Sequence, residues 1–136
     1  VSIQSQILNL LKDLQEQFKL TYLFISHDLG VVHYISDRIC VMFLGKVCEI
    51  GKTEEIYGDP LHPYTRFLLR AVPSMDPEKG HKGQEILTGE IPSAVNPPSG
   101  CRFRTRCPYA KEVCGQREPE LRNVGERKVA CHMAGE

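Results

Sequence analysis

Four of the six cysteines in this chain lie within its last 36 residues, in a segment too polar to form a core alone. They are Cys101, Cys107, Cys114 and Cys131. Cations stand between them in the sequence, at Arg102, Arg104, Arg106 and Lys111. Because cysteine is usually a small buried hydrophobe, this setting makes apolar burial a poor explanation and favours a cross-link or a metal centre. Neighbouring cations also predict lowered thiol pKa values and hence thiolates, the metal-binding form.

The spacing of these cysteines, C-x5-C-x6-C-x16-C, does not choose the centre. Zinc sites usually contain a C-x2–4-C pair, and ferredoxin-type runs use C-x2-C. An iron–sulfur cluster, a zinc ion, disulfides and free thiols therefore all remain open. His132 is a possible substitute ligand or a bystander. Cys40 and Cys48 lie in strand patterns, and we expect both to be buried core thiols.

Composition narrows the class of protein. A chain of 136 residues can bury one modest core. Its 17 basic and 17 acidic residues are balanced, which gives no bias toward nucleic acid. No apolar run approaches the ~20 residues of a membrane span, and no signal peptide is visible. The chain opens on a helix pattern without an initiator methionine, so we expect a fragment or a processed product. Without a secretory signal we expect a reducing compartment, where structural disulfides are disfavoured.

Periodicity predicts the elements of the first half. Apolar residues at helical spacing predict an amphipathic helix over 2–18 with Ser2 as its N-cap. The short apolar run 20–26 predicts a strand buried on both faces, as in a parallel sheet. The remaining predicted elements are a helix over 28–34 capped by Asp28, strands over 38–44 and 47–50 joined at Gly45-Lys46, a helix over 53–57 capped by Thr53, and a helix over 63–71 beginning at Pro63.

Three regions follow from this pattern. Residues 1–73 alternate helices and strands, which indicates an α/β layer fold. Residues 74–100 are rich in proline and glycine and indicate an extended linker. Residues 101–136 form the Cys-rich region, expected to be a separate small unit.

His27 stands directly after the predicted parallel strand and before a helix start. Ligands of open α/β sheets bind at the carboxyl ends of the strands, so this side chain would reach a bound phosphate. A solvated or capping histidine is the alternative. The chain has no G-x-x-x-x-G-K-S/T loop, so it would not cradle a nucleotide's phosphates by itself.

Longer stretches resemble a known family. The segments TYLFISHDLGVV (21–32), ISDRICVM (35–42) and GKVCEIG (45–51) resemble the last third of an ABC transporter ATPase subunit. The segments YGDPLHPYTRFLL (57–69), GEIPS (89–93) and PPSGCRFRTRCP (97–108) resemble its oligopeptide/dipeptide importer branch. The resemblance implies an α/β fold: the C-terminal part of an ABC-ATPase nucleotide-binding domain plus a small Cys-rich tail.

The resemblance also implies roles for particular residues. His27 matches the switch-loop histidine, which contacts the γ-phosphate of ATP and helps to orient the attacking water. The four cysteines of the tail, Cys101, Cys107, Cys114 and Cys131, match residues described as ligands of a 4Fe–4S cluster, with zinc as the alternative. The Walker A loop, signature motif and Walker B acids are absent from this sequence, so we expect no ATP hydrolysis by this chain alone.

The function implied is the energy-coupling subunit of a peptide importer, peripheral at the cytoplasmic face of the membrane. ATP with Mg²⁺, a second ATPase subunit and membrane permease subunits would be its partners, and nucleic acid would not. The isolated chain is expected to self-associate through the unpaired strand 20–26. The alternatives are a standalone iron–sulfur or zinc module and a plain interaction domain.

Overall fold

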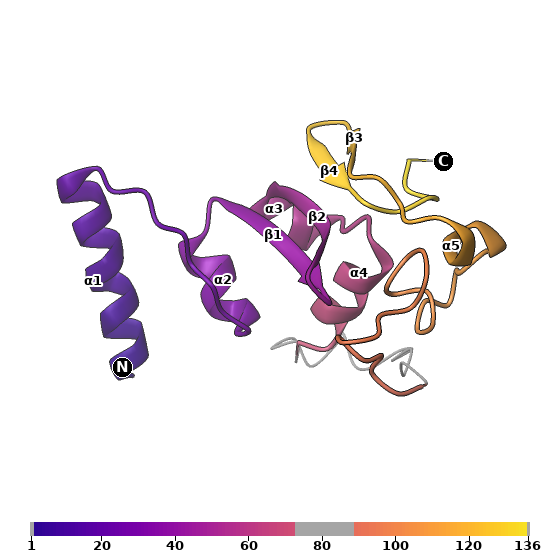
Figure 1. Cartoon of the computed structure of the whole chain (residues 1–136). Helices are drawn as coiled ribbons and strands as arrows, with labels where there is room; N and C mark the ends of the chain where they lie inside the picture. Colours follow the sequence, from indigo (N-terminus) through magenta and orange to yellow (C-terminus); the bar gives the residue numbers. More distant parts are fainter. Residues whose placement is uncertain (1, 73–88, 136) are drawn as a thin grey trace, which may run out of the picture. The chain divides into compact units, whose positions relative to one another are not determined.

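The computed structural model of this chain describes residues 2–72 and 89–135 and is drawn in Figure 1. It divides into two compact units, the first ending at Asp37 and the second beginning at Arg38. Residues 73–88, which include the larger part of the linker predicted over 74–100, lie outside the described residues.

The first unit begins with the predicted amphipathic helix, α1 (Ile3–Phe18). The prediction of its N-cap is confirmed, because the Ser2 hydroxyl accepts a hydrogen bond from the backbone N–H of Ser5 at 3.2 Å. No residue of α1 is buried, and the side chain of Ile3 is 75 % exposed. The predicted apolar stripe is therefore present, and most of it is exposed, while Leu11 and Leu14 are half-buried.

The predicted strand over 20–26 is wrong for this structure. These residues have no regular secondary structure, and the side chains of Leu23 and Ile25 are 93 % and 90 % exposed. A strand of a parallel sheet exists only where neighbouring strands satisfy its backbone, and no strand of the described residues pairs with this run. Two hydrogen bonds tie it to α1: the N–H of Leu20 donates to the carbonyl of Gln15 at 3.1 Å, and the hydroxyl of Tyr22 donates to the carbonyl of Leu11 at 2.9 Å.

A short second helix, α2 (Leu29–Ile35), follows as the sequence predicts. The Asp28 carboxylate caps it by accepting from the backbone N–H of Val31 at 3.0 Å. Tyr34 joins α2 to α1, because its hydroxyl donates to the Asn9 side chain and the Lys12 ammonium lies 4.0 Å from its ring centroid. Ile35, at the end of α2, is the one buried residue among the described residues of this unit, so side-chain contacts of this kind supplement a very small apolar core.

The second unit is built on an antiparallel sheet. Strands β1 (Arg38–Phe43) and β2 (Lys46–Lys52) form the predicted hairpin, with Phe43 opposite Lys46. Leu44 and Gly45 are its turn residues, and both have positive φ, 46° and 75°. Such a pair suits the type I′ turn that matches the twist of the strands. The turn therefore lies one residue earlier than the sequence predicts.

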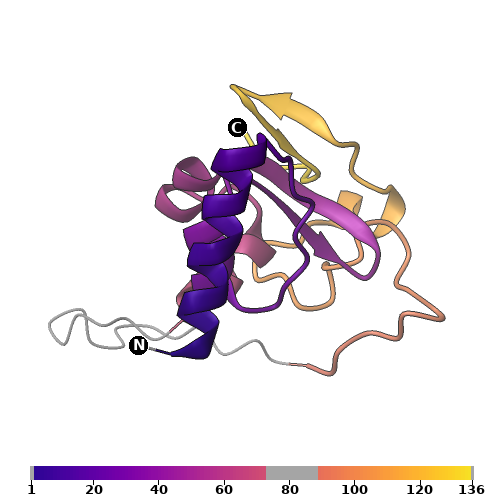
Figure 2. The ribbon, with the colours of Figure 1, turned by 90° about the vertical axis from the view of Figure 1, so that its left-hand side faces the viewer.

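The Cys-rich region adds two strands to this sheet, β3 (Arg122–Val124) and β4 (Arg127–Val129). The sheet order is β1-β2-β4-β3, and Glu49 of β2 lies opposite Val129 of β4. Figure 2 shows the β3–β4 hairpin in yellow beside the first hairpin. The sequence analysis expected a separate tail; in the structure the Cys-rich residues share the sheet and the compact unit of β1 and β2.

Three helices complete the second unit: α3 (Thr53–Gly58), α4 (Pro63–Arg70) and α5 (Glu112–Gln116). α3 contacts β1 and β2, and α4 contacts β2. Thr53 is the first residue of α3 and is buried, so the expectation that it is the N-cap is wrong; Lys52 holds that position. Among the described helices, none is long and apolar enough to cross a membrane.

The core of the second unit is small and lies in two clusters. One contains Phe43, Cys48 and Phe103, with Tyr64 packed against it. The ring centroids of Phe43 and Phe103 are 5.4 Å apart in an edge-to-face arrangement. The other cluster contains Val129, Cys131 and Ala134. Cysteines of the tail contribute to both clusters, so the tail is folded onto the sheet by apolar contacts.

Candidate functional site

His27, the predicted phosphate-contacting residue, lies in the first unit between the irregular run and α2. Its side chain is exposed. Its neighbour Asp28 is held by two hydrogen bonds, one to α2 and one from its own N–H to the Ser26 hydroxyl at 3.0 Å. The backbone on both sides of His27 is therefore anchored while its ring remains accessible.

The cysteine segment, residues 101–114 of the second unit, consists mainly of tight turns and ends in the short helix α5. One backbone hydrogen bond joins its two ends. The N–H of Cys101 donates to the carbonyl of Cys114 at 2.7 Å. Gly100, with φ of 68°, makes this approach possible, because a Cβ there would lie 2.2 Å from the same carbonyl oxygen. Cys101 and Cys114, thirteen positions apart in the sequence, are thus in direct backbone contact.

The burial of the four cysteines differs from the sequence expectation. The side chains of Cys114 and Cys131 are buried, and those of Cys101 and Cys107 are half-buried. Cys101 and Cys107 pack against the Phe43 cluster, and Cys131 belongs to the Val129 cluster. The sequence disfavoured apolar burial, but it does occur, because the tail packs against apolar residues that precede it in the chain: Phe43, Cys48, Leu61 and Tyr64.

The expectation that nearby cations lower the thiol pKa values is wrong for Cys101 and Cys107. Burial raises the pKa of both thiols, that of Cys107 to about 11. Two of the arginines are directed to backbone carbonyls: Arg102 donates to the carbonyl of Leu44, and Arg104 Nε donates to the carbonyl of Ser99 at 2.8 Å. For these two thiols the effect of burial therefore exceeds that of the neighbouring cations.

The four thiols are nevertheless neighbours. Charges on Cys114 and Cys131 would raise the pKa of Cys101, and charges on the other three would raise that of Cys107. In the part of the chain that the structure describes, no three side chains of His, Cys, Asp or Glu stand close enough to hold a metal ion. Four cysteines are chemically suited to bind a metal centre as thiolates. In the described residues, however, their side chains do not lie close enough together to ligate one ion.

The two other cysteines, Cys40 and Cys48, differ in burial. Cys48 is buried, as expected, and burial raises its pKa to about 12. Cys40 is exposed, so the expectation of a core thiol is wrong. It lies on β1, where side chains alternate between the two faces, and its face is not covered.

His132, the possible substitute ligand, instead hydrogen-bonds through Nε2 to the carbonyl of Arg117 at 2.8 Å.

A buried carboxylate that sequence reasoning missed organises the second unit. Glu49 on β2 is fully buried, and its oxygens accept hydrogen bonds from the backbone N–H groups of Leu61 and His62, both at 3.0 Å. Arg127 of β4 lies 3.6 Å away and supplies the opposite charge. The sequence did contain one signal of a buried carboxylate, because Glu49 lies among the apolar residues of the predicted strand 47–50. Its partners could not be inferred, because they are 12 or more positions away in the sequence.

Next to this carboxylate, His62 is the N-cap of α4. Its Nδ1 accepts from the backbone N–H of Tyr64 at 3.0 Å, and its ring centroid lies 6.1 Å from that of Phe103. Burial lowers its pKa to about 4, and a hydrogen bond with the backbone of Ala130 offsets part of that effect. His62 is thus a neutral structural residue at neutral pH.

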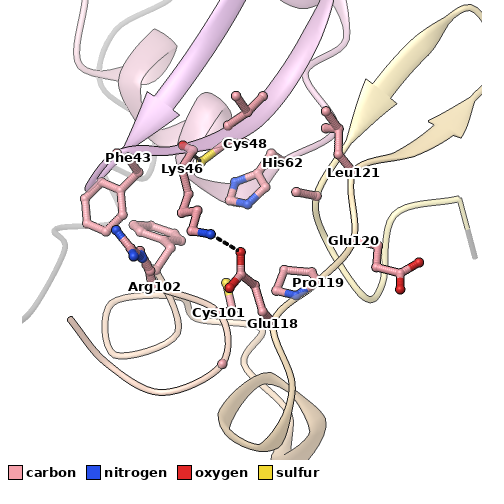
Figure 3. Close-up of a pocket in the computed structure, with 15 residues that line it drawn as sticks. Phe43, Lys46, Cys48, His62, Cys101, Arg102, Glu118, Pro119, Glu120 and Leu121 are labelled. Atoms are coloured by element: carbon pink, nitrogen blue, oxygen red, sulfur yellow. Dashed lines mark hydrogen bonds and ion pairs between the residues drawn. The ribbon is translucent and has the colours of Figure 1, made fainter.

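His62 also lines a cavity of about 490 Å³ within the second unit. Figure 3 shows His62 and Cys48 on one side of it and the segment Glu118–Leu121, which follows α5, on the other. Lys46 and Glu118 form an ion pair across it, with 2.7 Å between Nζ and Oε1. The cavity therefore has apolar walls and charged groups at one end.

Comparison with known proteins gives consistent relatives. Residues 48–114 match the family model of the oligopeptide/dipeptide transporter, C-terminal region. The chain is 54 % identical over 135 residues to the putative oligopeptide transport ATP-binding protein YkfD of Bacillus subtilis, covering 98 % of this chain and 41 % of the relative. It is 50 % identical to the di/tripeptide transport ATP-binding protein DppF of Pseudomonas aeruginosa, with the same coverage. A putative peptide import ATP-binding protein of Brucella ovis is 56 % identical over 91 % of this chain and 39 % of its own length. The chain thus spans about two fifths of the length of these relatives.

Proposed function

Because this chain belongs to the family of oligopeptide/dipeptide transport ATP-binding proteins, we propose that it forms the C-terminal part of the energy-coupling ATPase subunit of a peptide importer. The observation that carries the proposal is the identity of about half of all residues across nearly the whole chain. The structure is consistent with this proposal, since a small α/β unit with an antiparallel sheet suits the C-terminal part of such an ATPase.

Uncovered surfaces of the chain support its being part of a larger subunit. α1 exposes its apolar stripe, and the irregular run exposes Leu23 and Ile25 almost completely. The outer edge of β1 has no strand partner among the described residues. Exposed apolar stripes and open strand edges favour association. In the complete subunit other segments would cover them; in isolation they would drive self-association.

Within this proposal, His27 is the residue that contacts the γ-phosphate of ATP and orients the attacking water. Its exposure and the anchored backbone around it suit that role. ATP and Mg²⁺ would be held by residues of the complete subunit, which would pair with a second ATPase subunit. The pair would act on permease subunits from the cytoplasmic face of the membrane.

The test uses the complete subunit that contains this sequence, assembled with its membrane partners. The His27→Ala variant is expected to keep ATP binding and to lose at least tenfold in ATP hydrolysis, because one positioning contact in the transition state is removed. His33→Ala is the control, as this histidine lies on α2, six residues away. Full activity of the His27→Ala complex would refute the assigned role.

We further propose that Cys101, Cys107, Cys114 and Cys131 hold one metal centre, a 4Fe–4S cluster, with zinc as the alternative. Four thiols suit either centre, and the hydrogen bond between the backbones of Cys101 and Cys114 supports the proposal by bringing two of the four residues together. Their side chains would move together on binding. The centre would tie the cysteine turns to β4 and stabilise the tail.

Anaerobic purification followed by iron, sulfide and zinc analysis tests this second proposal. Cys114→Ser is expected to lose the metal, while Cys40→Ser, which changes an exposed cysteine on β1, keeps it. Retention of full metal content by Cys114→Ser would refute the ligand set. Zinc at one per chain would keep the ligand set and replace the cluster.

A further inference from the structure

The cavity of the second unit has the dimensions of a ligand site. Its volume of about 490 Å³ falls within the range of small-molecule pockets, roughly 300–1,000 Å³. It lies between the start of β2, the cysteine turns and the segment after α5. Of the four cysteines in the proposed metal centre, it is lined by Cys101 alone. The cavity therefore adjoins the proposed centre at this one residue.

The walls of the cavity are suited to an apolar group. Phe43 and Phe103 are buried aromatic residues of the core cluster. Further apolar residues of the lining include Val47, Pro119, Leu121 and Ala130. His62 also faces the cavity, but it is neutral because burial lowers its pKa to about 4. The inner part of the cavity thus offers apolar contact without a charge.

The charges are gathered at one end. Lys46 pairs with Glu118 there, and both side chains are about half exposed. The hydrogen bond with Lys46 is the largest cause that lowers the pKa of Glu118, and the charge of Arg102, which also lines the cavity, adds a smaller effect in the same direction. In Figure 3 the carboxylate of Glu120 points away from this group. The lining of the cavity therefore includes the cation Lys46, paired with Glu118, and a second cation, Arg102.

We propose that this cavity binds a small carboxylate that carries an apolar side chain. The apolar group would lie against Phe103 and Leu121. The ligand's carboxylate would take the place of Glu118 beside Lys46. Exposed ion pairs contribute little to stability, so displacing Glu118 costs little, and Arg102 has further N–H groups beyond the one that it donates to Leu44. Both free amino-acid derivatives and peptide C-termini carry this chemistry.

The first test is titration of the complete 136-residue chain with N-acetyl-leucine, followed by amide chemical shifts in nuclear magnetic resonance spectra. Saturable shifts are expected at Val47, Phe103 and Ala130, which line the cavity. N-acetyl-leucine amide, which lacks the negative charge, is expected to bind about fivefold more weakly. No saturation, or equal binding of the two compounds, would overturn the proposal.

Variants localise the site. Lys46→Gln is expected to weaken N-acetyl-leucine binding about fivefold. Lys52→Gln is the matched control, because Lys52 is at the other end of β2 and pairs with Glu126 outside the cavity. Leu121→Trp should fill the cavity and abolish binding, with an unchanged circular dichroism spectrum confirming the fold. Equal affinities of the Lys46→Gln and Lys52→Gln variants would refute the site.

A third comparison identifies the source of the carboxylate. The tripeptide Ala-Ala-Leu has the same C-terminal side chain and carboxylate as N-acetyl-leucine. Tighter binding of the tripeptide would assign the site to a peptide C-terminus. Equal or weaker binding would assign it to a free amino-acid derivative, and either result upholds the apolar carboxylate as the ligand class.

Discussion

The backbone N–H of Cys101 donates to the carbonyl of Cys114, and this 2.7 Å contact closes the cysteine segment. Gly100 precedes it with φ of 68°, and a Cβ at that position would stand 2.2 Å from the Cys114 oxygen. Side chains essentially never approach a backbone oxygen so closely. The fold of the cysteine turns therefore depends on a residue that is not itself a cysteine.

Gly100→Ala should consequently destabilise the second unit by about 3 kcal/mol, from the left-handed backbone and the steric clash together. Gly125→Ala is the matched control, because its φ of 63° is similar but no atom lies within 4 Å of the added Cβ. It should cost about 1 kcal/mol. Urea unfolding followed by circular dichroism measures both, and equal losses would contradict the role of the Cys114 contact.

Glu49→Gln tests the buried carboxylate. The amide preserves the volume but removes the charge opposite Arg127, and one of the N–H groups of Leu61 and His62 would face an amide donor. Breaking a buried pair in this way costs about 3 kcal/mol. Glu126→Gln, which breaks the exposed pair with Lys52, should change the unfolding midpoint little. Similar midpoints for the two variants would show that Glu49 is not a structural centre.

Local signals in the sequence identified most helices and the first hairpin. Ser2 and Asp28 are capping residues whose effect is confined to the next turn, and Pro63 begins α4 as predicted. The hairpin at Leu44-Gly45 likewise depends on neighbouring residues. Such elements form for reasons that are visible within a few residues.

Long-range pairing could not be inferred in the same way. The run 20–26 has the composition of a buried strand, but a strand requires partners that composition does not supply. The pairing of β2 with β4 joins residues about 80 positions apart, and the three-residue strands give almost no pattern. The arginines beside the cysteines suggested thiolates, whereas Arg102 and Arg104 bind carbonyls. Burial then raises the pKa of Cys101 and Cys107.

The pH dependence of stability should show the titration of His62. Its pKa is about 4 in the folded protein and about 6.5 when unfolded, so below 6.5 the unfolded state binds more protons. Stability from this group is therefore constant above pH 6.5 and falls as the pH drops toward 4, by about 3 kcal/mol in all.

His62→Asn provides the comparison for this prediction. Asparagine keeps an N-cap acceptor for α4 but does not titrate in this range. The difference in unfolding free energy between the wild type and this variant, measured from pH 7.5 to 4.5, should shrink as the pH falls. A difference that is independent of pH would mean that His62 does not carry the titration.

Thiol labelling should separate Cys40 from Cys48, although both lie on the first hairpin. Cys40 is exposed and accessible to a maleimide, while Cys48 is buried with a pKa raised to about 12, so it has neither access nor thiolate. Under native conditions mass spectrometry should find Cys40 modified first and Cys48 modified only after unfolding. Cys40→Ser should remove the fast phase and leave the protection of Cys48 unchanged. Labelling of both at one rate in the wild type would mean that the cluster around Phe43 opens as readily as the surface of β1, and that the small core does not exclude solvent.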